Sequence, residues 1–330
     1  MSITAIVPVW NGRDLLERLL LSLEAQTERA SELLVVDNGS EDGAPDLARQ
    51  HGARVIPMGR NAGFAAAVNR GIRESRTGWI AVLNSDVELA PDYFAALSAA
   101  GGWFASGKIL SYAGESGSRM IDGTFDVVCR GGTAWRAGSA RPDGPDFDAP
   151  RTITSPPWTA VLFRAELFRI VGLLEESFES YLEDVDFGLR CAAHQLDGRY
   201  VPSAVAWHRG SATLGRWHPE TVRRISRNQV LLLARHYSGG LLWRCCWPIA
   251  VAHLLWGGLA FRHGAGWAWL RGKWQGIQSF PGARKLAGPF DSGLLPRLRS
   301  NEKTIRTLQQ STGFDRYWSL YFHLTGGGAK

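Results

Sequence analysis

The chain has 330 residues, of which 45% are hydrophobic and 21% are charged. This composition fits one large or two modest globular domains and excludes a disordered chain. No run of about 18 uncharged apolar residues occurs, so we expect no membrane-spanning helix. The four cysteines form no CxxC pair, and the N-terminus carries no charged-then-apolar export signal. We therefore expect a cytoplasmic protein without disulfides.

The net charge of +6 conceals an asymmetry along the chain. Residues 1–198 carry 18 Lys and Arg against 27 Asp and Glu, whereas residues 199–330 carry 19 against 4. An acidic front joined to a strongly basic back indicates two tasks, one of them at an anionic surface.

The first hundred residues alternate short apolar runs with amphipathic helical patterns. The apolar runs that predict buried strands are Ile3–Val9, Leu33–Asp37, Arg54–Pro57 and Trp79–Asn84. Helical patterns follow each strand: the leucines between residues 15 and 23, Asp46–Gln50, Ala62–Ser75, and a helix beginning near Pro91. This alternation predicts an α/β fold in which helices cover both faces of a mostly parallel sheet. Ligands of such sheets bind outside the carboxyl ends of the strands.

The side chains expected at that edge are carboxylates and amides rather than a glycine-rich phosphate loop. The first strand is not followed by GxGxxG, and the chain has no GxxxxGK[ST] motif, which disfavours dinucleotide-binding and P-loop proteins. The polar residues there are Asn11, Asp37, Asn38, Asn84, Asp86 and Glu88. Oxygen ligands of this kind suit a hard divalent cation that bridges a diphosphate.

Six segments in chain order make the pattern specific: IVPVWNG (6–12), VVDNGSEDG (35–43), RNAGFAAAVNRGI (60–72), LNSDVEL (83–89), YLEDVDFGLR (181–190) and VPSAVAWHRGSAT (201–213). Together they resemble the successive motifs of family 2 glycosyltransferases, and most closely the bacterial rhamnosyltransferase-like subgroup that builds cell-surface polysaccharides. The resemblance implies a GT-A fold. It implies a nucleotide-sugar-binding half at 1–100 and an acceptor-binding half with the catalytic base at 101–238. Residues 239–330 would then form a basic, Trp-rich helical region.

The resemblance also assigns residues to the donor. Asp37 would accept the imide N–H of uracil or thymine, a role that suits a carboxylate because it only accepts hydrogen bonds. Pro8, Trp10 and Asn11 would line the same base pocket, and Gly63 would allow close backbone approach to the nucleotide. Asp37 as a turn cap and Trp10 as ordinary packing remain open alternatives.

Asn84-Ser85-Asp86 occupies the position of the family's DxD motif. We expect an extended strand in which Asn84, Asp86 and Glu88 project to the same side. Asp86 would bind a divalent metal, with His208 as a further ligand or a purely structural residue. A surface turn before Pro91 is the competing interpretation of this segment. Because Asn84 stands where many relatives have Asp, the choice between Mg²⁺ and Mn²⁺ stays open.

Glu183-Asp184 corresponds to the family's ED motif, which makes Asp184 the general base, with Glu183 as the alternative. Acids that only stabilise the start of a helix through its dipole are the competing interpretation. A sugar hydroxyl is a poor nucleophile until its proton is removed, so the reaction needs such a group. Asp186 is expected to be structural. Trp158 is a candidate stacking platform for the acceptor sugar, and a core Trp is the competing interpretation. Arg209 and Arg216 are candidates for pairing with diphosphate oxygens.

Residues 241–277 contain six Trp interleaved with Arg and Lys. Such a segment suits the interface of an anionic membrane, so the protein would be peripheral on the inner face of the cytoplasmic membrane. Packing against the catalytic domain or against a second subunit of a homo-oligomer is the alternative. No nucleic-acid-binding module is recognisable. Residues 281–330 are basic and only weakly patterned.

The leading hypothesis is an inverting, metal-dependent glycosyltransferase. Its donor would be dTDP-rhamnose or a UDP-sugar, and its acceptor a hydroxyl of a glycan or of a polyprenyl-linked sugar. A non-catalytic module that binds sugar nucleotides or glycans is the alternative, to which Asn84 gives slight support. A nucleotidyltransferase is disfavoured because residues 10–13 (WNGR) fit poorly to the Gly-rich, Arg-containing loop that it needs.

Overall fold

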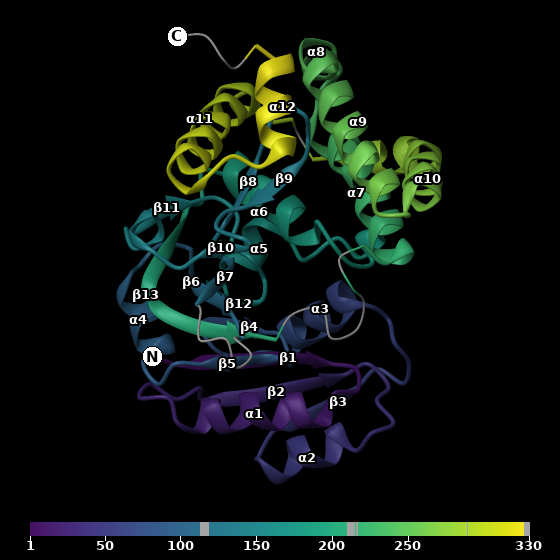
Figure 1. Ribbon diagram of the computed structural model, residues 1–330. Helices are drawn as coiled ribbons and strands as arrows, with labels where there is room; N and C mark the ends of the chain where they lie inside the picture. The colour runs from purple at the N-terminus through teal and green to yellow at the C-terminus, as the bar shows by residue number, and fades with distance from the viewer. Residues whose placement is uncertain (113–118, 210–214, 216, 289, 327–330) are drawn as a thin grey trace. The chain divides into compact units, whose positions relative to one another are not determined.

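The computed structural model describes residues 1–112, 119–209, 215, 217–288 and 290–326 (Figure 1). By packing, the chain divides into two compact units. Unit 1 comprises residues 1–125 and 138–210, and unit 2 comprises residues 126–137 and 211–330. The functional halves expected on either side of residue 100 are not tested by this division and stay a prediction.

Four parallel strands form the first part of the unit 1 sheet, in the order β4-β1-β2-β3. Their bounds are Ile3–Val9 (β1), Glu32–Asp37 (β2), Arg54–Pro57 (β3) and Trp79–Leu83 (β4). The expected strands are confirmed to within a residue. Val9 pairs with Asp37, so β1 and β2 end together at one edge.

The sheet continues beyond β4 with mixed strand directions, through β12, β6, β7 and β10. Strand β13 pairs with β6 in parallel, and with β5 and β11 antiparallel. The bounds are Val87–Leu89 (β5), Phe104–Ser111 (β6), Met120–Gly123 (β7), Arg141–Pro142 (β10), Arg151–Ile153 (β11), Ala160–Arg164 (β12) and Gly198–His208 (β13).

Helices cover both faces of the parallel strands, as side-chain alternation along β1 requires. Ile3, Ala5 and Val7 point into a core that includes the leucines of α1, whereas Ile6 points to α3. There a Cβ on Gly71 would come within 2.4 Å of Ile6 Cγ2, so glycine permits the close approach. The helices of unit 1 are Arg13–Glu24 (α1), Ala44–Gln50 (α2), Phe64–Glu74 (α3), Tyr93–Ala99 (α4), Leu167–Val171 (α5) and Glu183–Ala193 (α6), with 3-10 turns at Pro145–Phe147 and Glu176–Phe178. The α/β fold class is thereby confirmed.

Unit 2 is mostly helical. It contains Pro219–His236 (α7), Gly239–Arg244 (α8), Cys246–Arg262 (α9), Gly266–Lys285 (α10), Leu294–Thr312 (α11) and Arg316–Leu324 (α12), together with the strand pair Asp126–Val128 (β8) and Ala134–Arg136 (β9). The helical region expected from residue 239 onward is present, and α11 and α12 lie in the part that the sequence patterned only weakly. None of the helices in the described ranges is long and apolar enough to cross a membrane.

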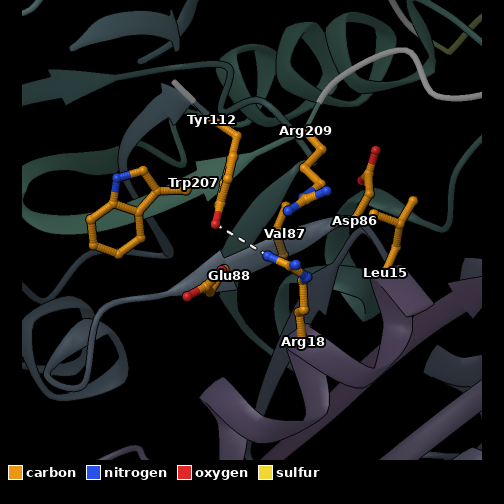
Figure 2. A pocket seen from close by; sticks show the side chains of 8 residues that line it. All are labelled: Leu15, Arg18, Asp86, Val87, Glu88, Tyr112, Trp207 and Arg209. Atoms are coloured by element: carbon orange, nitrogen blue, oxygen red, sulfur yellow. Dashed lines mark hydrogen bonds between the residues drawn. The ribbon is translucent and has the colours of Figure 1, made fainter. Parts of the chain in front are cut away.

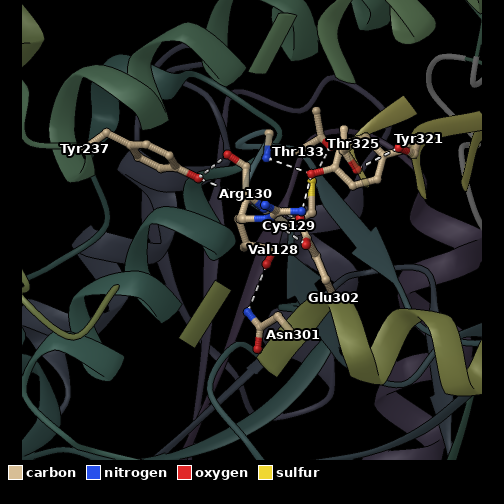
Figure 3. Close-up of polar contacts among 10 residues, drawn as sticks. Val128, Cys129, Arg130, Thr133, Tyr237, Asn301, Glu302, Tyr321 and Thr325 are labelled. Atoms are coloured by element: carbon tan, nitrogen blue, oxygen red, sulfur yellow. Dashed lines mark hydrogen bonds and ion pairs between the residues drawn. The ribbon is translucent and has the colours of Figure 1, made fainter. Parts of the chain in front are cut away.

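A buried polar network joins β8–β9 to α11 and α12 (Figure 3). Arg130 Nε donates to Glu302 Oε2 at 2.7 Å, and the Arg130 backbone N–H donates to Oε1 at 3.0 Å. Tyr321 Oη donates to the same carboxylate at 2.6 Å. A buried charge that is both paired and hydrogen-bonded is tolerated, whereas an unpaired one is costly. The network therefore ties the C-terminal helices to the strand pair.

Candidate active site

The expected donor residues gather at the carboxyl edge of β1 and β2. Asp37 is 8% exposed, and one of its carboxylate oxygens accepts a hydrogen bond from the Ser40 amide at 2.9 Å. The Asn11 backbone N–H donates to Ser40 Oγ, so the turns after the two strands are joined. Trp10 is 46% exposed and is not a core residue. Its ring is available to a ligand at this edge, while Pro8 is buried within β1 opposite Val36.

Contacts extend from this edge toward the expected catalytic base. Asn38 Nδ2 donates to the Gly63 carbonyl, and Asn38 Oδ1 accepts from the Ala62 amide, both at 3.3 Å. Gly63 has φ 90°, and a Cβ there would lie 3.2 Å from the Glu179 carbonyl oxygen. Glycine is needed because this close approach and this φ both disfavour a side chain. The segment leading into α6 therefore packs against the start of α3.

Asn84-Ser85-Asp86 forms a turn between β4 and β5, so the expectation of an extended strand was wrong. The Val87 amide donates to the Asn84 carbonyl at 3.4 Å, and the Asn84 amide donates to the Thr159 carbonyl at 2.9 Å. The turn arises because the chain leaves β4, whose neighbours are β1 and β12, and pairs next with β13 through β5. As a result, Asp86 lies next to the end of β13.

His208 lies beside Asp86, which brings the two expected metal ligands together. His208 is the last residue of β13 and pairs there with Val87 of β5. His208 Nε2 is 3.1 Å from Asp86 Oδ1, and His208 Nδ1 is 3.0 Å from Asp122 Oδ2 in β7. Burial by itself lowers the pKa of His208, but the hydrogen bonds with Asp122 and Asp86 raise it to about 9. Asp122 was missed because no motif in its own segment marks it.

The donor set fits a divalent metal that is shared with a substrate. Among the residues that the structure describes, no group of three or more His, Cys, Asp and Glu is arranged to hold a metal ion alone. Mg²⁺ usually keeps several waters and is held by one or two carboxylates together with substrate phosphates. Asp86 and His208 supply two adjacent donors, while Asp122 contacts the other ring nitrogen and would orient the imidazole.

Glu183 and Asp184 occupy the first turn of α6. Glu183 is 6% exposed and Asp184 is half-buried. Tyr181 and Leu182, directly before them, have φ of 73° and 69°. Left-handed backbone at non-glycine residues costs roughly 1–3 kcal/mol each and clusters at functional sites. Strain at the entry to α6 therefore supports a functional role for this turn.

Asp186, in the same turn, has the structural role that we expected. It is fully buried and accepts a hydrogen bond from Arg190 Nε at 3.0 Å. Arg190 also donates to the carbonyls of Val171 and Leu173. This ion pair fixes α6 against the end of α5.

Trp158 is a core residue, and its expected role as an acceptor platform requires correction. It is 3% exposed, and its ring centroid lies 4.7 Å from that of Phe163 and 5.0 Å from that of Phe187. A ring enclosed by phenylalanines has no face open to a sugar. Trp158 instead packs in the hydrophobic core, in agreement with the competing interpretation that it is a core Trp.

Two arginines near Asp86 form a cationic group that the sequence only partly indicated (Figure 2). Arg18 of α1 donates to Tyr112 Oη at 3.1 Å, and the Arg209 guanidinium lies 4.3 Å from the centre of the Tyr112 ring. All three line a small pocket with Asp86 and Glu88. A neighbouring pocket of about 300 Å³ is also lined by Tyr112 and Glu88. Arg216, the other expected arginine, lies outside the described residues.

Comparison with known proteins places this geometry in a family. The sequence profile described as Glycosyl transferase family 2 matches residues 4–100. An N-acetylglucosaminyl-diphospho-decaprenol L-rhamnosyltransferase of Mycobacterium tuberculosis is 31% identical over 272 residues, which cover 75% of this chain and 87% of that protein. The chain therefore belongs to glycosyltransferase family 2. It is an enzyme, an inverting glycosyltransferase, rather than a non-catalytic binding module.

Solved structures show the same fold at low sequence identity. S. aureus TarS 1-349 in complex with UDP-GlcNAc has a TM-score of 0.52 at 16% identity, covering 99% of this chain and 92% of that one. GalNAc-T7 with UDP, GalNAc and Mn²⁺ has a TM-score of 0.62 at 12% identity, covering 95% of this chain and 58% of that one. These likenesses confirm the expected GT-A architecture.

Proposed function

We propose that this enzyme transfers a rhamnosyl group from dTDP-rhamnose to a hydroxyl of an N-acetylglucosamine unit carried on a polyprenyl diphosphate. The activity of the mycobacterial relative, a rhamnosyltransferase acting on N-acetylglucosaminyl-diphospho-decaprenol, supports this acceptor. The observation that carries the proposal is the contact of Asp86 with His208 on the sheet edge that also bears Asp37. A UDP-sugar is the alternative donor, because Asp37 would accept the imide N–H of uracil and thymine alike.

Asp37 and Trp10 would hold the base of the donor, one by a hydrogen bond and the other by its exposed ring. Asp86 and His208 would hold a divalent metal, which when bound stabilises negative charge on the departing diphosphate. His208 must lose a proton to become a ligand, since its pKa is about 9. Arg18 and Arg209, which line a pocket with Asp86, would pair with phosphate oxygens.

Asp184 would act as the general base. It takes the proton of the acceptor hydroxyl while that oxygen forms a bond to the anomeric carbon. The bond from the anomeric carbon to the diphosphate oxygen breaks in the same step, and the diphosphate leaves with the electron pair. Attack from the opposite face inverts the anomeric configuration and needs no enzyme nucleophile.

The test is Asp184→Asn, assayed with dTDP-rhamnose and a short-chain polyprenyl-diphosphate GlcNAc. We expect the transfer rate to fall by about 10²–10⁴-fold, because a positioned base contributes that much, while donor binding is retained. Rates are measured by release of dTDP, and donor binding by thermal shift.

Asp14→Asn serves as the matched control, because the Asp14 side chain is 91% exposed on α1. Near-normal turnover of Asp184→Asn would show that the base is misassigned, and Glu183→Gln then tests the alternative. Turnover of UDP-sugars in preference to dTDP-rhamnose would overturn the proposed donor.

A further inference from the structure

Helices α8 to α10 lie in a part of the chain that has no carboxylate side chain. Residues 221–290 contain no Asp or Glu and ten Lys and Arg. The charge of this segment is therefore not compensated locally. A surface formed by it attracts anions and repels cations over about a Debye length.

Helix α10 turns a glycine face inward and an apolar face outward. A Cβ on Gly272 would come within 2.2 Å of the Arg223 carbonyl, and one on Gly276 within 2.7 Å of Val230 Cβ, so α10 packs tightly on α7. On α10, four residues spaced three or four apart are exposed: Trp267 at 82%, Leu270 at 40%, Trp274 at 62% and Ile277 at 58%. This spacing places them along one side of the helix. We call these four residues the α10 apolar face.

Helices α8 and α9 add further exposed apolar side chains. Trp247 is 57% exposed, Leu254 is 66% and Phe261 is 54%, at a spacing of seven residues along α9. Trp243 of α8 is 80% exposed. Isolated exposed apolar residues are ordinary, but repeated large ones on neighbouring helices mark an interaction surface.

Exposed basic residues accompany these aromatic side chains. Arg271 and Lys285 are exposed on α10, and Arg244 and Arg262 are exposed on α8 and α9. Tryptophan favours the headgroup level of a bilayer, where its ring is apolar and its N–H reaches polar groups. Lysine and arginine beside it are attracted to anionic lipid headgroups.

We propose that the α10 apolar face, with the exposed residues of α8 and α9, docks this enzyme on an anionic phospholipid bilayer. A second copy of the chain is the competing occupant. A two-fold symmetric interface would bring the same patch against itself, and residues 221–290 offer no carboxylate to pair with their own Lys and Arg. Charge complementarity therefore selects the bilayer.

The experiment is flotation of the full chain with vesicles, without donor or acceptor, so that its outcome is independent of the proposed sugar transfer. We expect binding to vesicles of phosphatidylcholine with phosphatidylglycerol, and binding at least about tenfold weaker to phosphatidylcholine alone. Tryptophan emission should shift to shorter wavelength on binding, because the exposed rings leave water.

Trp267→Ser with Trp274→Ser should weaken binding about tenfold or more, and so should Arg271→Gln with Lys285→Gln. Leu21→Ser with Ile170→Ser is the matched control, since these residues are 53% and 41% exposed in unit 1, and it should bind as the parent does. Circular dichroism and melting confirm that each variant is folded.

Equal binding to both kinds of vesicle, or unchanged binding of both α10 double variants, would overturn the proposal. Light scattering measures the oligomeric state and so tests the alternative that a second copy of the chain covers this face. If the parent is a dimer that the tryptophan double variant converts to a monomer with vesicle binding intact, the face is a subunit interface and the bilayer proposal is wrong.

Discussion

The sheet edge of unit 1 and the helices α9 and α10 of unit 2 differ in which side chains they bury and which they expose to water. At the edge, charged side chains are partly buried and hydrogen-bonded to one another, as Asp86, His208 and Asp122 are. On α10, large apolar side chains point into water while glycines pack inward. Buried polar groups require defined partners, whereas an apolar surface requires only helical spacing.

This contrast predicts that the two regions respond differently to substitution. Changes at the edge should alter ligand binding and turnover with little effect on stability, because the site is assembled on strands that the core already holds. Changes inside the described part of unit 2 should alter stability with little effect on turnover per folded molecule, because none of its described residues is assigned to the chemistry.

The largest expected effect is a loss of unfolding free energy in Arg130→Ala, in the buried network of unit 2. The substitution leaves the Glu302 carboxylate, whose side chain is 8% exposed, without its cationic partner. Breaking a buried ion pair in this way costs about 3 kcal/mol or more. Urea unfolding measures the loss. Arg299→Ala, an exposed position on α11, should stay within about 0.5 kcal/mol of the parent. A loss below about 1 kcal/mol for Arg130→Ala would contradict the importance of the network.

A somewhat smaller effect should come from Asp122→Ala at the edge. Without Asp122 the imidazole of His208 loses the partner that orients it, and such partners are worth about 10–100-fold in metal affinity. Titration calorimetry of Mn²⁺ into the protein with dTDP present measures this, and circular dichroism checks that the variant is folded. Asp122→Asn keeps an acceptor oxygen and should recover part of the affinity. Unchanged Mn²⁺ affinity in Asp122→Ala would argue against His208 as a ligand.

The smallest expected effect is a pH dependence of stability caused by Glu220 at the start of α7 in unit 2. Hydrogen bonds from Arg223 are the main cause that lowers the pKa of Glu220 to about 2; burial opposes them and Arg224 adds to them. Because the folded pKa is depressed, this stabilisation is present above pH 4.5 and is lost as the pH falls toward 2. Its size is at most about 1 kcal/mol, since the Glu220 side chain is 34% exposed.

Melting temperatures of the parent and of Glu220→Gln, recorded from pH 6 to pH 3, measure this contribution. The gap between them should narrow as the pH falls. Glu41→Gln, at an exposed position of unit 1, should show no such trend. A gap that is constant over this range would show that the ion pairs do not contribute.

The sequence was sufficient to predict a helix or strand where the hydrophobic pattern of that segment alone defines it. Strand β1 was predicted at its observed bounds because Ile3–Val9 is apolar and ends at a turn. The region from residue 239 onward was expected to be helical, but the bounds of α11 were not predicted, since most of its residues are polar. Its buried face becomes apparent only when β8 supplies a partner, as where Asn301 donates to the Val128 carbonyl.

The sequence by itself determined the α/β class, the family motifs and the residue types at the sheet edge, because strand and helix periodicities and motif order are local properties. Only the tertiary structure decided that Asp86, Asp122 and His208 meet, that Asn84–Asp86 is a turn, and that Trp158 is enclosed in the core. The first two depend on the pairing of β13 with β5 and β6, and the third on the packing of Phe163 and Phe187 against Trp158. Both kinds of contact join segments that are apart in the chain, and no local pattern encodes them.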